Sequence, residues 1–218
     1  MPAAPTTLAA LRSLLAARFP EKTRRLVGAI PTGVAAVDKA LAGGLPVGRL
    51  TELVSTAPSS GGQTVLTHLL ASTRSARQRV ALVDGADGFA PGTVPPDVLR
   101  HLVWVRCRTP AEALAAADLL VRDGNYAVIA LDLRGLAERA LRKQPATAWY
   151  RLQRAAEGGA AAVLVLTPHP LVPAVPWRLV LRTPLTIEHV RTPREVLAAR
   201  LAVETDRGHA AAQEELAG

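Results

Sequence analysis

The feature that most constrains the fold is an alternation of short apolar runs with segments of helical periodicity, which begins near residue 30. The runs suited to buried strands fall at 50–54, 80–83, 102–105, 126–131, 161–166 and 178–181. Between several of them, apolar residues recur at helical spacing, as at 64–74 and 148–157. Parallel strands joined by crossover helices produce this order. The sequence therefore predicts an α/β fold with a mostly parallel central sheet flanked by helices.

One helix is marked at both of its ends. Thr109 is a typical capping residue, Pro110 suits a first helical turn, and Glu112 completes a capping box. Gly124 is the kind of residue that commonly follows the last helical turn. A helix is therefore predicted between Thr109 and Gly124.

The chain divides into an arm, a core and a tail. Residues 1–25 are expected to form an N-terminal amphipathic helix and a charged linker, residues 26–206 one core domain, and residues 207–218 a frayed, polar tail. The apolar stripe of the arm, which could pack on a neighbouring molecule, consists of Leu8, Leu11 and Leu15. Before the tail two patterns compete, because Thr192 and Glu195 form a second capping box while 200–205 alternates like a strand. Both readings are left open.

Composition excludes several classes of protein. A length of 218 residues, of which 49% are hydrophobic, suits one substantial core. The single cysteine, Cys107, excludes a disulfide framework and is typical of a reducing compartment. The sequence contains neither a long apolar span nor a secretory leader, and its five histidines lack metal-ligand spacing. We therefore expect a cytoplasmic protein without a membrane segment or a bound metal.

The net charge of +8 is compatible with a polyanionic partner or an acidic protein surface, and also with the codon bias of a GC-rich genome. Basic residues are dense between 134 and 154, where they could neutralise DNA phosphates without sequence preference or simply form a solvated helix face. Both interpretations are kept. The members of this basic cluster are Arg134, Arg139, Arg142, Lys143, Arg151 and Arg154. Aromatic residues make up only 3% of the chain, so stacking on unpaired bases is not expected.

A degenerate phosphate-binding loop lies between the first strand and the first long helix. Such a loop uses glycines to turn backbone amides toward phosphates, a lysine to bridge the terminal phosphates, and a hydroxyl for magnesium. Here Ala57 replaces the first glycine and Gln63 replaces the lysine, whereas Gly62 and Thr64 are retained. An ordinary glycine turn before a helix is the alternative. The candidate residues are Ala57, Ser60, Gly61, Gly62, Gln63, Thr64 and, from a later strand, Asp132.

Neighbouring segments give this loop a context. The stretches 30–33 (IPTG), 37–38 (VD) and 43–53 (GGLPVGRLTEL) resemble, in wording and order, the entry to the core of RecA-family recombinases. The strand ending at Asp84 resembles the second core strand of that family, and the strand ending at Asp132 resembles the one whose aspartate assists magnesium. The resemblance covers roughly residues 30 to 185. It implies a RecA-like core and, by analogy with the DNA-contacting loops of RecA, assigns 133–147 and 168–176 to those positions.

The same resemblance implies a loss of catalysis. Ala86 stands where working recombinases carry a glutamate that polarises the attacking water, and Gln63 removes a positive charge from the transition state. We therefore expect no catalytic residues and no efficient ATP hydrolysis. ATP and Mg²⁺ are not expected as resident cofactors, although the amides of Ser60, Gly61 and Gly62 could hold a phosphate.

Three further segments resemble the ImuA family, a RecA-like and SulA-like group from inducible mutagenesis operons. They are 102–106 (LVWVR), 112–120 (EALAAADLL) and 149–156 (WYRLQRAA). The resemblance implies an adapter in SOS-type translesion synthesis that is associated with the nucleoid when engaged. Its partners would be an inactive, ImuB-like homologue of Y-family polymerases and an error-prone replicative-type polymerase, with RecA, a second copy of the chain or non-specific DNA as further partners. The alternatives left open are an ATP-dependent, DNA-binding recombinase paralogue and a SulA-like inhibitor of cell division.

Overall fold

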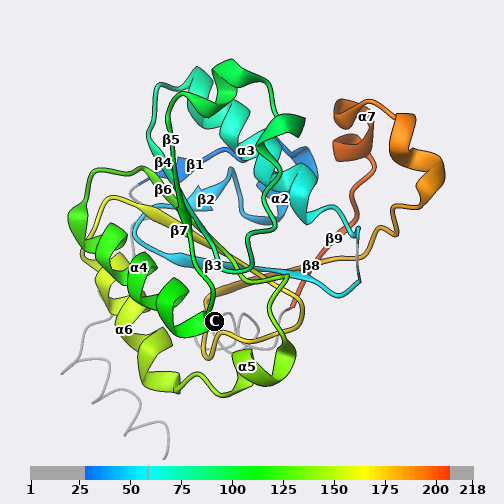
Figure 1. The fold of residues 1–218 in the computed structure, drawn as a ribbon. Coiled ribbons are helices and arrows are strands. Elements are labelled where there is room, and N and C mark those ends of the chain that lie inside the picture. Colours follow the sequence, from blue (N-terminus) through cyan, green and yellow to red (C-terminus); the bar gives the residue numbers. More distant parts are fainter. Residues whose placement is uncertain (1–27, 58, 207–218) are drawn as a thin grey trace, which may run out of the picture.

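The computed structural model describes residues 28–57 and 59–206. Its centre is a seven-stranded sheet with the strand order β5-β4-β6-β7-β3-β8-β9. All neighbouring strands are parallel except β8 and β9, which are antiparallel. Helices cover the sheet on both faces (Figure 1). The predicted α/β architecture with a mostly parallel sheet is therefore confirmed. The N-terminal helix with Leu8, Leu11 and Leu15 lies outside the described residues.

The strands follow the apolar runs closely. Their bounds are β3 (Leu50–Ser55), β4 (Val80–Asp84), β5 (Leu102–Arg106), β6 (Val128–Asp132), β7 (Ala162–Thr167), β8 (Trp177–Leu181) and β9 (Val203–Thr205). Every residue of β3, β4, β6 and β7 is buried, which is the environment that continuous apolar runs require. At the sheet edge, β5 is only partly buried.

Two helical layers enclose the sheet (Figure 1). On one face lie α2 (Ala35–Ala40) and α3 (Gly62–Ser75), whose Leu66, Leu69 and Leu70 are fully buried in one core cluster. On the other face lie α4 (Pro110–Asp123) and α6 (Ala146–Glu157), which pack on each other and bury Trp149 and Leu152 in a second cluster. Burial of each large apolar side chain contributes about 1.5–3 kcal/mol, so both layers are anchored by hydrophobic packing.

The predicted cap at Thr109 and the predicted end of α4 at Gly124 are confirmed, whereas the capping box through Glu112 does not form. The Thr109 hydroxyl accepts a hydrogen bond from the Glu112 amide at 3.2 Å, and Gly124 follows the helix with φ of +72°. The Glu112 carboxylate accepts instead from the Arg108 amide at 2.9 Å, one residue before the cap. The helix thus has satisfied amides at its first turn and a left-handed residue at its end.

Several elements were not anticipated from the sequence. A two-stranded antiparallel pair joins β1 (Ala29–Ile30) to β2 (Leu45–Pro46), and a short helix, α5 (Glu138–Arg142), follows β6. Both patterns near the end of the core are realised in succession, as α7 (Arg194–Ala199) and β9. The predicted capping role of Thr192 is wrong, because the residue preceding α7 is Pro193 and no side chain caps that helix. A capping box forms instead between Thr186 and His189, at the start of the 3₁₀ turn Ile187–Arg191.

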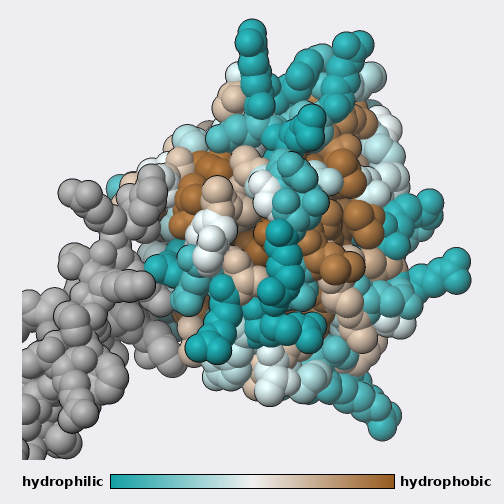
Figure 2. All heavy atoms as spheres, turned by 90° about the vertical axis from the view of Figure 1, so that its left-hand side faces the viewer, coloured by the Kyte–Doolittle hydropathy of each residue, from teal (hydrophilic) through white to brown (hydrophobic). Residues whose placement is uncertain are grey.

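The surface on the side of α4 and α6 mixes polar and apolar side chains. Figure 2 shows hydrophobic patches on this side that are divided by a band of hydrophilic residues. Leu119 on α4 is 69% exposed, and Tyr150 on α6 and Val103 on β5 are also exposed. Of the helices between residues 28 and 206, none is both long and apolar enough to cross a membrane.

Candidate functional site: a phosphate loop with a paired arginine

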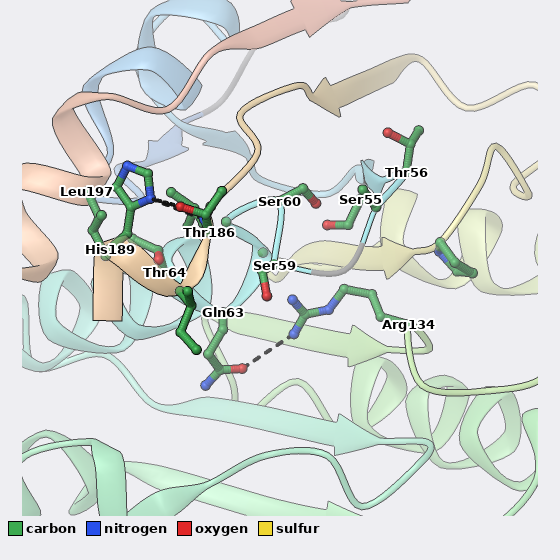
Figure 3. A pocket seen from close by; sticks show the side chains of 16 residues that line it. Ser55, Thr56, Ser59, Ser60, Gln63, Thr64, Arg134, Thr186, His189 and Leu197 are labelled. Carbon is green, nitrogen blue, oxygen red and sulfur yellow. Dashed lines mark hydrogen bonds between the residues drawn. The ribbon is translucent and has the colours of Figure 1, made fainter. Parts of the chain in front are cut away.

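The segment between β3 and α3 borders a pocket of about 770 Å³. One wall is the loop itself, from Ser55 to Thr64, and the other is formed by the segment 185–197 (Figure 3). The Leu185 amide donates a hydrogen bond to the Ser59 carbonyl at 3.1 Å, which ties the two walls together. The pocket thus lies at the strand-to-helix turn that the sequence singled out, and its second wall had no signal in the sequence.

Glycine permits the observed geometry of the loop at two positions. Gly61 has φ of +100°, and a β-carbon there would clash with the side chain of Leu201. At Gly62 a β-carbon would clash with Nη1 of Arg134 and would lie 2.8 Å from Oγ of Ser55. The loop therefore needs Gly61 for its conformation and Gly62 for the close approach of a cationic side chain.

Gln63 occupies the position expected for lysine, and a different cation reaches the loop. The guanidinium of Arg134 extends from the end of β6 toward α3, and its Nη2 donates to Oε1 of Gln63 at 3.4 Å (Figure 3). Arg134 was expected in the basic cluster, but the structure places it apart from the other members, with a side chain that is 21% exposed. The positive charge missing from α3 is thus supplied by a residue 71 positions away.

Asp132, the expected remnant of a magnesium ligand, is held by the same arginine. Oδ1 accepts from Nε of Arg134 at 2.9 Å, and Oδ2 accepts from Nη2 at 2.6 Å. Oδ1 also accepts from the Arg134 amide at 3.2 Å. This bidentate pair is mostly buried, a setting in which charge-assisted hydrogen bonds are strong. Both carboxylate oxygens are therefore already engaged, and the arrangement does not fit Mg²⁺ coordination.

The other carboxylates near β4 are also committed. Asp84 is 2% exposed and accepts hydrogen bonds from the amides of Gly88 and Phe89 and from the indole of Trp104. Asp87 forms an ion pair with Arg106, whose hydrogen bond lowers the pKa of that carboxyl. Neither residue lines the pocket. Ala86 and its neighbours thus offer no carboxylate that could activate a water at the loop.

Similar proteins are found among the bacterial recombinases. RecA of Frankia alni is 38% identical over 119 residues, which are 53% of this chain and 34% of that protein. RecA of Nocardia farcinica is 36% identical over 123 residues, which are 53% of this chain and 34% of that protein. RecA of Streptomyces coelicolor is 34% identical over 120 residues, which are 53% of this chain and 31% of that protein. The core is RecA-like. The chain spans about a third of the length of these curated relatives, and no model of a known protein family matches it.

The rest of the basic cluster lies around α5 and α6 of this RecA-like core. Arg139, Arg142, Lys143, Arg151 and Arg154 are all exposed. Arg142 pairs with Glu138 one helical turn away, and Arg151 lies 3.6 Å from Asp118 of α4. Exposed pairs of this kind are weak and leave the guanidinium groups accessible. The cluster thus consists of five surface residues rather than six.

A buried polar network behind the loop had no signal in the sequence. Glu52 of β3 is fully buried, and its Oε1 accepts from the Thr167 hydroxyl and from the amides of Leu171 and Val172, at 2.7–3.1 Å. Its Oε2 accepts from Nε of Arg178 at 2.6 Å. Burial lowers the pKa of Arg178, but the hydrogen bonds and charges of Glu52 and Asp206 together outweigh it, so that the net shift is upward. The network fixes the proline-rich segment after β7 against β3 and β8.

Proposed function

We propose that the protein is a non-catalytic RecA-like adapter in SOS-type DNA damage tolerance, where it organises an error-prone translesion synthesis complex through protein–protein contacts. The observation that carries the proposal is the Arg134–Asp132 pair beside the phosphate loop, together with Gln63 in the lysine position. The loop keeps its place in the fold while its metal-binding and catalytic groups are replaced or engaged elsewhere.

The proposed loss of hydrolysis is supported by the state of the lysine position and of two carboxylates. The usual lysine stabilises charge that develops on the transferred phosphoryl group, and each 1.36 kcal/mol lost there slows the reaction about tenfold. Asp132 has both oxygens on Arg134, and Asp84 is occupied by the loop that follows it. A metal-dependent reaction would first have to break a mostly buried ion pair.

The finer role, in translesion synthesis, is supported by the resemblance of three segments to the ImuA family. In that role the partners are an ImuB-like inactive homologue of Y-family polymerases and an error-prone replicative-type polymerase, with RecA as a further candidate. The exposed Leu119 and Tyr150 offer apolar contacts on the side of α4 and α6. The five exposed basic residues would add salt-dependent, non-specific contact with DNA and association with the nucleoid.

The test combines an activity assay with a binding assay on the full chain. Purified protein with ATP, Mg²⁺ and single-stranded DNA is expected to release no phosphate above background, while a RecA control does. An immobilised ImuB-like protein is expected to retain the chain. Leu11→Asp should reduce retention, and Ser13→Asp, on the other side of the expected helix, should not. Undiminished retention of Leu11→Asp would exclude the arm as the contact.

An ATP-dependent recombinase paralogue is the competing proposal, and it is favoured by the similarity to RecA over about half the chain. Micromolar ATP affinity with magnesium-dependent phosphate release would establish it and overturn the adapter role. A SulA-like division inhibitor would be supported by filamentation of cells that overexpress the chain, and normal septation would exclude it.

A further inference from the structure

Unsatisfied polar groups converge on the phosphate loop. The first amides of an α-helix have no partner within the helix, and those of α3 begin at this loop. The hydroxyls of Ser55 and Ser60 line the pocket and have no hydrogen-bond partner, although Ser55 is 8% and Ser60 only 4% exposed. Buried hydroxyls are normally hydrogen-bonded, so the unpaired hydroxyls of Ser55 and Ser60 indicate that the pocket accepts a ligand with hydrogen-bonding groups.

Arg134 adds N–H donors without an acceptor to the phosphate loop. A guanidinium carries five N–H donors. Those on Nε and Nη2 contact Asp132 and Gln63, whereas Nη1, which lies against Gly62, donates no hydrogen bond within the part of the chain that the structure describes. Hydroxyls, amides and Nη1 therefore all present hydrogen-bond donors around Gly62 (Figure 3).

The electrostatics of this arrangement favour an anion. The N-terminal end of α3 carries partial positive charge, and the guanidinium of Arg134 beside it raises the local electrostatic potential further. The pair of Arg134 and Asp132 is formally neutral, but Asp132 binds the far side of the guanidinium and does not line the pocket, so that the pair turns its positive group toward the loop. A negatively charged group with several acceptor oxygens would satisfy the hydroxyls, the helix amides and Nη1 together.

We propose that this loop binds the phosphate group of a small molecule through Arg134, without a divalent cation. The arginine takes the place of the missing lysine, and Asp132 serves as its positioning carboxylate rather than as a magnesium ligand. This site does not depend on the adapter role: a failure of the chain to bind the ImuB-like protein would refute the adapter role and leave the site standing, whereas a lack of metal-free phosphate binding would refute the site and leave the adapter role standing.

Isothermal titration of the full chain with pyrophosphate and with ATP, each in EDTA and in Mg²⁺, tests the proposal. Binding of at least one ligand in EDTA is expected, with no strengthening by Mg²⁺. Tighter binding of ATP than of pyrophosphate would identify a nucleotide as the source of the phosphate, and equal binding would identify the phosphate groups alone. Absence of heat from both ligands at about 1 mM would overturn the proposal.

Variants separate a binding role of Arg134 from a blocking one. Arg134→Gln should weaken binding at least about tenfold, as expected for the loss of a charge-assisted contact. Arg106→Gln is the matched control, because it breaks a similar arginine–aspartate pair at the end of β5, outside the pocket, and should bind like the parent. Unchanged or tighter binding by Arg134→Gln would show that the arginine closes the loop and would refute the proposal.

Asp132→Asn distinguishes the positioning role from metal coordination. The proposal expects this variant to bind phosphate in EDTA more weakly than the parent, because asparagine holds the guanidinium with one acceptor oxygen in place of two and carries no charge; equal binding would refute the positioning role. If Mg²⁺ strengthened phosphate binding by the parent but not by Asp132→Asn, the carboxylate would be assigned to a metal, and the metal-free site would be overturned. Far-ultraviolet circular dichroism establishes that each variant is folded.

Discussion

Replacing Arg178 by methionine should destabilise the protein far more than its position at the surface end of a strand implies. Arg178 donates to Glu52, which is 0% exposed and lies on β3, an interior strand of the sheet. Arg178→Met keeps most of the apolar stem but leaves the Glu52 carboxylate buried without its cation. The remaining donors are the Thr167 hydroxyl and the amides of Leu171 and Val172.

The magnitude follows from burial of an unpaired charge. Removal of one partner from a buried ion pair typically costs about 3–5 kcal/mol. With a urea dependence of about 2 kcal/mol per molar, this loss lowers the unfolding midpoint by roughly 2 M. The double variant Glu52→Gln/Arg178→Met should be more stable than Arg178→Met alone, because glutamine keeps an acceptor for the three donors and carries no charge.

Urea titration followed by circular dichroism measures these midpoints. Arg182→Met is the matched control, since Arg182 follows the same strand and pairs with Glu204 at 2.9 Å while both side chains are more than half exposed. An exposed pair contributes about 0–1 kcal/mol, so the control should shift the midpoint little. Equal shifts for Arg178→Met and Arg182→Met, or a double variant less stable than Arg178→Met, would refute the reasoning.

Three further predictions concern other parts of the chain. Gly61→Ala should lower stability by about 1–2 kcal/mol in urea titration because of its left-handed backbone, and Gly88→Ala, where a β-carbon meets no atom within 4 Å, should not. The pKa of His101 is lowered from 6.5, chiefly by burial, so the unfolded chain takes up the proton first. Stability should therefore fall as pH drops below about 6.5, less steeply in His101→Asn; equal slopes would contradict this origin. If Arg142 and Lys143 contact DNA, their joint replacement by glutamine should reduce the slope of log affinity against log salt by about 2 in anisotropy titrations, and an unchanged slope would assign them another role.

The elements that the sequence predicted are those fixed by local patterns. Continuous apolar runs located the buried strands to within two residues at each end, because burial on both faces imposes the same requirement at successive positions. The capping of α4 by Thr109 was likewise legible, since the residues concerned lie within a few positions of one another. In contrast, Thr192 matched a capping pattern, but in the folded chain α7 is preceded by Pro193 and has no side-chain cap.

The candidate site was predictable in position but not in chemistry. The glycines and Gln63 identified the loop, and Asp132 was assigned to it because its strand resembles the one in RecA-family recombinases whose aspartate assists magnesium. Arg134 was grouped with nearby basic residues, because nothing local shows that its side chain turns back to a helix 71 positions earlier. The Glu52–Arg178 pair spans 126 positions, so a lone glutamate in a strand gave no sign of its partner. Contacts between residues that only the strand order brings together leave no trace in the local periodicity of the sequence.

The strand order also determines when the phosphate loop can be completed during synthesis. β3 is the first strand of the large sheet to leave the ribosome, but both of its neighbours, β7 and β8, begin only at residues 162 and 177. β4, β5 and β6, in contrast, have one another as partners once residue 132 has emerged. The loop at the end of β3 is thus synthesised early, but the strands that flank β3 are synthesised late. A nascent chain that has emerged from the ribosome to a point between residues 132 and 162 would have three strands able to pair and an unpaired β3, a state in which that strand is exposed to chaperones and to other chains.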